Sequence, residues 1–330
     1  MADRASLDCG SGFHVELRPE MSVRQAMTAV YRELLEKMRC NAKGIVEDLD
    51  IEHLHDFRVA VRRTRSGLGQ MRDALPVRET GKFRREFAWL GHVTGPVRDL
   101  DVCLGHEQQY TLLLPESLRS GLTPFFSALR AQRAVERERL IRQLASARYR
   151  RLITAWQECL DRSGGESGPS GRPMLDAVRE ILQRRFRTVI REGKKIHSSS
   201  PPEKLHRLRI RCKKLRYLLE FSASLFPRED IGPAIRQLKR LQENLGDFND
   251  RAVQQAILEH HLATLRSGSR ADLETAASLG GLLARLHHDQ QRVRRQFDRR
   301  FREFARPANV GLYGRLIGKQ DRSAGTGHRE

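Results

Sequence analysis

Apolar residues along this chain recur at steps of three and four, the spacing that gives an α-helix one apolar face. The first such run predicts a helix over residues 22–43, whose face is formed by Val23, Ala26, Val30, Leu34 or Leu35, and Met38. Further helices are predicted at about 50–75, 80–93, 124–159, 174–191, 200–226, 230–244 and 272–305. No alternating apolar and polar run of useful length appears, so the predicted class is all-α.

Part of this pattern repeats. The segment HDFRVAVRRTR at residues 55–65 returns as HRLRIRCKKLR at residues 206–216, an offset of 151. The same offset, without a gap, aligns Pro76 with Pro227 and Gly95 with Gly246. We expect a helix to stop at each of these glycines, because glycine readily adopts a left-handed conformation after a helix end. The pattern indicates an internal duplication.

The duplication divides the chain into five predicted segments. They are a loose N-terminal arm at 1–20, a first repeat at 21–160, a linker at 161–172, a second repeat at 173–305 and a flexible C-terminal tail at 306–330. The linker is assigned from its Gly, Ser and Pro content, and the tail from its turn towards Gly, Pro and Arg.

The chain is strongly basic. It has 61 Lys and Arg against 41 Asp and Glu among 330 residues, a formal charge of +20. Such an excess predicts a polyanionic partner. The N-terminus lacks the basic start and apolar core of a signal peptide, and no run of about 18 apolar residues could span a membrane. We therefore expect a cytoplasmic protein without membrane association.

The repeated cations fall on one side of a helix. At about 100° per residue, one narrow stripe collects His55, Arg58, Arg62 and Arg65, and lies about a quarter-turn from the apolar face. The second copy places His206, Arg209, Lys213 and Arg216 in the same way, while Arg63 and Lys214 flank the stripes. A solvated face would accept acids as well as cations, yet no acid occupies a stripe position in either copy. The stripes therefore predict a basic groove between helices.

Other chemistry has weaker signals. Glu52 with His55, and Glu203 with His206, have a Glu-x-x-His spacing used by di-iron bundles, but the cations on the same face would repel a metal ion. The five cysteines form no CxxC pair, and neither a Walker loop nor a nucleophile motif occurs. A phosphoanhydride enzyme would need a carboxylate cluster. Asp99, Asp101 and Asp250 are candidates for it, although capping or pairing between helices explains them more simply. We predict no metal, no cofactor and no enzymatic activity.

Four separated motifs resemble the CHAD domain, the conserved histidine α-helical domain. They are HxxRVxxRR at 55–63, GPVRDLD at 95–101, HxLRxxxKKLRY at 206–217 and LGDFND at 245–250. The resemblance covers residues 20 to 305 and implies two pseudo-symmetric helical bundles that enclose a basic cavity for inorganic polyphosphate, often at polyphosphate granules, without catalysis. Carried over by position, it implies a binding set of His55, Arg58, Arg62, Arg63, Arg65, His206, Arg209, Lys213, Lys214 and Arg216.

Nucleic acid is the alternative partner for the same cations. Phe, Trp and Tyr make up only 6% of the chain, and Tyr217 is the one aromatic residue beside a basic stripe. Base stacking is therefore poorly provided for, and we expect nucleic acid to bind more weakly than polyphosphate.

Overall fold

The structure is a computed structural model that describes residues 10, 12, 15–164, 171–265 and 269–318. Within these residues the chain forms helices and no β-strand, which confirms the predicted all-α class. None of the described helices is long and apolar enough to cross a membrane.

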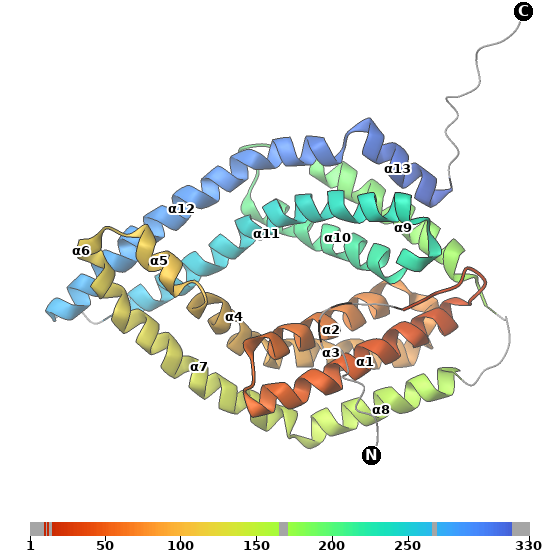
Figure 1. The fold of residues 1–330 in the computed structure, drawn as a ribbon, viewed down its shortest axis with the longest axis horizontal. Helices are drawn as coiled ribbons and strands as arrows, with labels where there is room; N and C mark the ends of the chain where they lie inside the picture. Colours follow the sequence, from red (N-terminus) through yellow and green to blue (C-terminus); the bar gives the residue numbers. More distant parts are fainter. Residues whose placement is uncertain (1–9, 11, 13–14, 165–170, 266–268, 319–330) are drawn as a thin grey trace, which may run out of the picture.

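The helices fall into two groups by sequence (Figure 1). The first half contains α1 (Val23–Glu47), α2 (Ile51–Gln70), α3 (Val77–Val93), α4 (Gly95–Leu104), α5 (Glu107–Leu113), α6 (Glu116–Arg119), α7 (Thr123–Leu144) and α8 (Ala147–Gly164). The second half contains α9 (Met174–Gly193), α10 (Pro202–Phe221), α11 (Arg228–Thr264), α12 (Arg270–Phe304) and α13 (Pro307–Ile317). Short 3₁₀ turns lie at η1 (Arg72–Ala74), η2 (Ser120–Leu122) and η3 (Ala223–Leu225).

The element boundaries repeat at the offset found in the sequence. Adding 151 to the bounds of α2 gives those of α10, and the same holds for η1 and η3. The N-terminal ends of α1 and α9 meet in an antiparallel bridge between Ser22 and Pro173, which are themselves 151 residues apart. The N–H of Val23 donates to the Arg172 carbonyl (3.1 Å), and the N–H of Met174 donates to the Met21 carbonyl (2.8 Å). Val23 corresponds to Met174 at this offset, and Arg172 corresponds to Met21, so each hydrogen bond is the counterpart of the other. A local two-fold axis would relate them in the same way.

The two halves differ where the third helix was predicted to stop. In the first half α3 ends, a single turn residue, Thr94, follows, and α4 begins at Gly95. In the second half α11 continues through Gly246, so the predicted stop there is wrong. Pro96, the residue after Gly95, has no N–H to donate to the His92 carbonyl, whereas the corresponding residue, Asp247, has one. Glycine alone costs a helix only about 1 kcal/mol, which packing easily offsets.

Apolar packing joins the halves at two places. One buried cluster contains apolar side chains of α1, α2, α3 and α8 together with α9, α10 and α13. A second cluster joins α4, α5 and α7 to the C-terminal part of α11 and the N-terminal half of α12. The long helices α7, α11 and α12 converge towards that second cluster (Figure 1). The two halves therefore share their core instead of forming two independent units.

The predicted tail is wrong for the residues that form α13. Leu312, Tyr313 and Leu316 are buried, and the Tyr313 ring stacks on Phe186 with 4.0 Å between ring centroids. Their apolar spacing, combined with Pro307 in the first turn, makes this segment helical, and burial against α9 and α11 holds it. The rest of the predicted tail, 319–330, lies outside the described residues.

The predicted arm and linker are only partly described. Leu17 in the arm is buried, and its N–H donates to Ser224 Oγ (2.8 Å), so residues around it are held against the second half. At the linker, α8 extends to Gly164, beyond the predicted end of the first repeat. Residues 1–9 of the arm and 165–170 of the linker lie outside the described residues.

Candidate functional site: a cationic cavity

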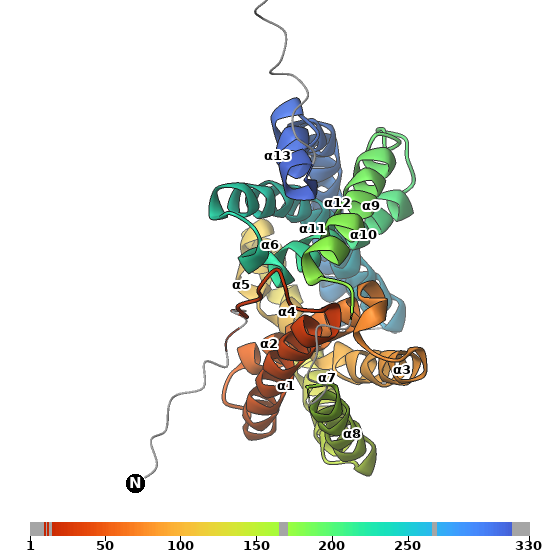
Figure 2. The same ribbon diagram turned by 90° about the vertical axis from the view of Figure 1, so that its right-hand side faces the viewer.

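Helices α2 and α10, which carry the two predicted stripes, contact each other where the halves meet (Figure 2). The amide Nε2 of Gln70 on α2 donates to the carbonyl of Lys214 on α10 at 3.1 Å. Nearby, Arg63 Nη2 and Glu220 Oε2 form an ion pair at 3.1 Å. The contact brings together stripes that are 151 residues apart in the sequence.

A cavity of about 750 Å³ lies beside this contact, walled by α2, α3, α9 and α10. Half of its fourteen described lining residues are Lys or Arg, and none of the fourteen is Asp or Glu. We call this space the cationic cavity. Its seven cations are Arg62, Arg65, Arg84, Arg85, Arg185, Lys213 and Lys214.

Four of the ten predicted site residues line the cationic cavity: Arg62 and Arg65 from α2, and Lys213 and Lys214 from α10. Arg62 and Arg65 are three residues apart and so share a helix face. Lys213 and Lys214 are adjacent on α10, and both still line the cavity. Sequence reasoning missed the other three cations. Arg84 and Arg85 lie on α3 and Arg185 on α9, outside the repeated segment, and the sequence marks them only by the Arg-Arg pairs at 84–85 and 184–185.

Lys213 shows how burial and neighbouring cations together act on an amine of this cavity. Burial, together with Arg209, Arg62 and Arg216, lowers the pKa of Lys213 to about 7, and Asp250 opposes this shift only in part. The pKa of Lys214 is also lowered, by burial and by Arg185, Arg211 and Arg84. Two amines that water would keep charged are therefore destabilised in their charged forms. An anion placed among them would reverse both shifts.

Glu220 forms ion pairs with two of the predicted cations. Its two carboxylate oxygens pair with Arg63 Nη2 at 3.1 Å and with Arg216 Nε at 3.3 Å. Neither arginine lines the cationic cavity. The Arg63 pair therefore joins α2 to α10, while the Arg216 pair lies within α10.

Arg58 forms hydrogen bonds within the first half of the chain. Its Nη1 donates to the Gly91 carbonyl (3.1 Å) and to Thr94 Oγ1 (2.9 Å), at the interruption between α3 and α4. Burial and the neighbouring Arg62 lower its pKa, while Asp99 raises it. Arg58 does not line the cavity, but it extends the row of cations from Arg62 along α2.

The corresponding arginine of the second half, Arg209, pairs with Asp250 Oδ1 at 3.4 Å. Asp101, another acid considered for an enzyme site, pairs with Arg133 Nε at 2.5 Å. Both carboxylates are thus engaged in pairing between helices, in agreement with the simpler interpretation of these acids.

The two histidines of the stripes, His55 and His206, lie outside the cavity lining. The pKa of His55 is lowered by burial and then by Arg98. His206 Nδ1 lies 2.7 Å from Asn249 Oδ1, and the offset places Asn249 opposite Arg98 in the first half. Among the residues that the structure describes, no three His, Cys, Asp or Glu are grouped so as to hold a metal ion.

Known proteins resemble this chain in sequence and in fold. The family model of the CHAD domain matches residues 29–259. The Mycobacterium tuberculosis proteins MT2285 and Rv2226 are each 27% identical over 205 residues, which cover 61% of this chain and 38% of theirs.

Two solved structures share the fold. The crystal structure of the CHAD domain from the plant Ricinus communis matches with a TM-score of 0.69 and 23% identity, covering 92% of this chain and 94% of that one. PptA from Streptomyces chartreusis matches with a TM-score of 0.58 and 17% identity, covering 84% of this chain and 99% of that one.

Proposed function

Because this chain belongs to the CHAD domain family, whose members are associated with polyphosphate binding, we propose that its cationic cavity binds inorganic polyphosphate. The observation that carries the proposal is the composition of the cavity: seven cations and no carboxylate among its described lining residues. A linear phosphate chain has repeating charge and no sequence to read. Guanidinium groups can meet it with bidentate hydrogen bonds, and ammonium groups with point charge.

Electrostatic cost supports the same ligand. Burial, and after it the neighbouring cations, lower the pKa of both Lys213 and Lys214, so keeping these amines charged in the empty protein costs free energy. Solvent exposure alone does not offset this electrostatic cost. A bound polyanion does, because its negative charges stabilise the charged forms of the amines. A dense polyanion also releases condensed counterions when it binds, which favours association at low salt.

The cavity favours a phosphate chain over a nucleic acid. Tyr217 is the one aromatic residue among the described lining residues, and only 6% of it is exposed. The Arg216 guanidinium lies 5.8 Å from the centre of its ring. Bases would find no open aromatic surface for stacking there, so we propose that nucleic acid binds more weakly.

We propose binding without hydrolysis and without a cofactor. A phosphoryl-transfer site places a carboxylate or a metal ion beside the phosphates to orient the nucleophile and spread charge. The described lining of this cavity offers cations only, and Asp101 and Asp250 are paired with arginines elsewhere. A cytoplasmic location, at polyphosphate granules where these form, follows as part of the proposal.

A competition experiment tests the proposed function. The protein is titrated with long-chain polyphosphate, duplex DNA and single-stranded RNA at equal phosphate concentration, and orthophosphate release is followed with and without magnesium. We expect polyphosphate to displace both nucleic acids and no orthophosphate to appear. Preference for DNA or RNA would move the assignment to nucleic-acid binding, and steady orthophosphate release would move it to an enzyme.

A further inference from the structure

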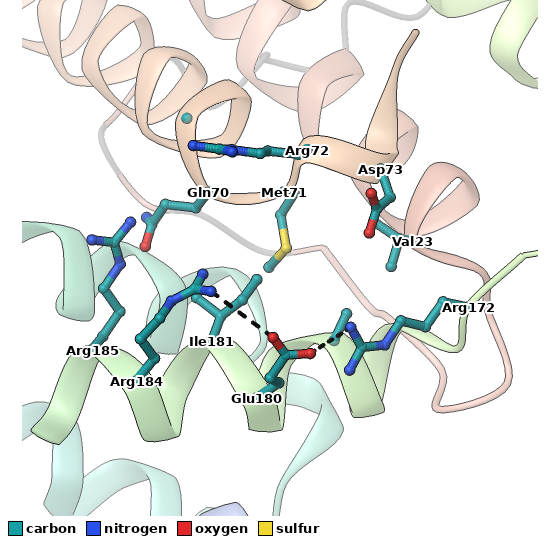
Figure 3. Close-up of a pocket in the computed structure, with 12 residues that line it drawn as sticks. Val23, Gln70, Met71, Arg72, Asp73, Arg172, Glu180, Ile181, Arg184 and Arg185 are labelled. Carbon is teal, nitrogen blue, oxygen red and sulfur yellow. Dashed lines mark ion pairs between the residues drawn. The ribbon is translucent and has the colours of Figure 1, made fainter. Parts of the chain in front are cut away.

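A second cavity of about 370 Å³ adjoins the cationic cavity (Figure 3). The two share three lining residues, Gly69, Gln70 and Arg185. We call this space the side cavity. It lies between the end of α2, η1 and the first half of α9, where the two halves of the chain meet.

The side cavity is also cationic, but its charge is partly neutralised. Its described lining includes Arg72, Arg172, Arg184 and Arg185, with Asp73 and Glu180 as the acids. Figure 3 shows Glu180 between two arginines. Its carboxylate pairs with Arg172 Nη1 at 2.6 Å and with Arg184 Nη1 at 3.9 Å.

Arg185 connects the two cavities. It lines both, and its pKa is lowered by burial and then by Arg184, Arg211 and Arg72. Its Nε is buried without a hydrogen-bond partner, and so is Oε1 of Gln70, the side chain beside it. Arg185 thus carries its charge at the junction between the side cavity and the cationic cavity.

We propose that the side cavity is an extension subsite for polyphosphate: a chain too long for the cationic cavity bends past Arg185 and seats its next phosphates against Arg72 and Arg184. This inference rests on the proposed function and adds a preference for chain length to it. A short chain is held in the cationic cavity, where seven cations act without a competing acid. A longer chain gains affinity by displacing Glu180 from its arginines.

Paired variants separate the two subsites. In the side cavity we choose Arg72→Met with Arg184→Met, since both side chains are exposed and neither lines the cationic cavity. In the cationic cavity we choose Arg62→Met with Arg65→Met. The affinity of each double variant is measured for tripolyphosphate and for long-chain polyphosphate, and thermal melting is used to check folding.

The side-cavity double variant should lose roughly tenfold in long-chain affinity and leave tripolyphosphate binding unchanged, because only the long chain reaches Arg72 and Arg184. Equal losses for both chain lengths, or no loss for either, would overturn the extension subsite. The cationic-cavity double variant should weaken both ligands. If it changes neither, the proposed function itself fails, whatever the side cavity does.

Glu180→Gln is the opposing test. It keeps the size of the side chain and removes the charge that holds Arg172 and Arg184. Long-chain affinity should rise severalfold while tripolyphosphate affinity stays constant. A fall in long-chain affinity would mean that Glu180 positions the arginines instead of competing for them, and would contradict the proposed displacement.

Discussion

The two halves of the molecule carry cations at the same stripe positions, yet they supply the cationic cavity differently. From α2 the cavity takes Arg62 and Arg65, and from α10 it takes Lys213 and Lys214. The counterpart of Arg65 is Arg216, and the counterpart of Lys214 is Arg63. Both of these counterparts are paired with Glu220.

Glu220 accounts for this asymmetry. The offset places it opposite Gly69, which has no side chain, so the first half offers no equivalent carboxylate. One acid in one copy therefore decides which cations are paired with a carboxylate and which face the cavity. Repetition of charge in a sequence shows where cations lie on a helix, but their availability depends on what the neighbouring helix presents.

The largest expected effect comes from reversing charge in one half at a time. Arg62→Glu with Arg65→Glu alters α2, and Lys213→Glu with Lys214→Glu alters α10. Each double variant should lower affinity for long-chain polyphosphate on the order of 100-fold or more, because two charges change sign inside one cavity. Isothermal titration calorimetry measures the affinities.

The matched control is Arg139→Glu with Arg142→Glu on α7. Both side chains are mostly exposed and pair only with neighbours on the same helix, so the control makes the same change in net charge away from the cavity. Strong loss in the control, or loss from only one half, would contradict a cavity that both halves line.

The second effect depends on pH and contrasts Lys213 with its counterpart Arg62. In the free protein the pKa of Lys213 is lowered to about 7, because burial first, and then Arg209, Arg62 and Arg216, disfavour its charged form more than Asp250 favours it. A bound polyanion raises that pKa, so binding takes up a proton. Affinity should therefore fall as pH rises above about 7, by up to about tenfold per pH unit.

Lys213→Arg makes the two halves alike at this position. Arginine stays charged throughout the range, so the variant should lose the pH dependence between about 7 and 9 and should no longer take up this proton. Calorimetry in buffers of different ionisation enthalpy measures the uptake. A pH profile that the substitution leaves unchanged would assign the titration to another group.

A third, smaller effect separates cavity cations from paired cations. Lys214→Met should weaken polyphosphate binding severalfold and lower the slope of log K against log salt by about 0.7 to 0.9, the contribution of one phosphate. Its counterpart Arg63→Met should change the slope little, since Arg63 is engaged with Glu220. Equal changes in the two slopes would show that the ion pair opens on binding and would return Arg63 to the site.

The smallest effect concerns the interrupted helix. At Gly246 an added Cβ would meet nothing within 4 Å, so Gly246→Ala should raise the free energy of unfolding by about 1 kcal/mol. At Gly95 the same substitution should destabilise the protein, since Pro96 crowds the Cβ of a helical residue before it. Urea denaturation measures both. Stabilisation by Gly95→Ala would mean that Pro96 is not the cause of the interruption.

The helical class, the positions of most of the long helices and the repeat followed from the sequence, because apolar spacing and turn residues act over a few neighbouring residues. The stripe residues Arg62, Arg65 and Lys213, and the flanking residue Lys214, were predicted in the same way. Motif spacing pointed to the CHAD domain family, which the family model confirms. These predictions need only the geometry of one helix at a time.

Tertiary structure alone decided which cations share a cavity. Arg84, Arg85 and Arg185 join the site because α3 and α9 pack beside α2 and α10, while Glu220 removes Arg63 and Arg216 from it. Packing also turned the expected tail at residues 307–317 into a buried helix. Contacts between residues more than a hundred positions apart, such as Arg63 with Glu220, depend on how whole helices pack, and local sequence patterns carry no record of that arrangement.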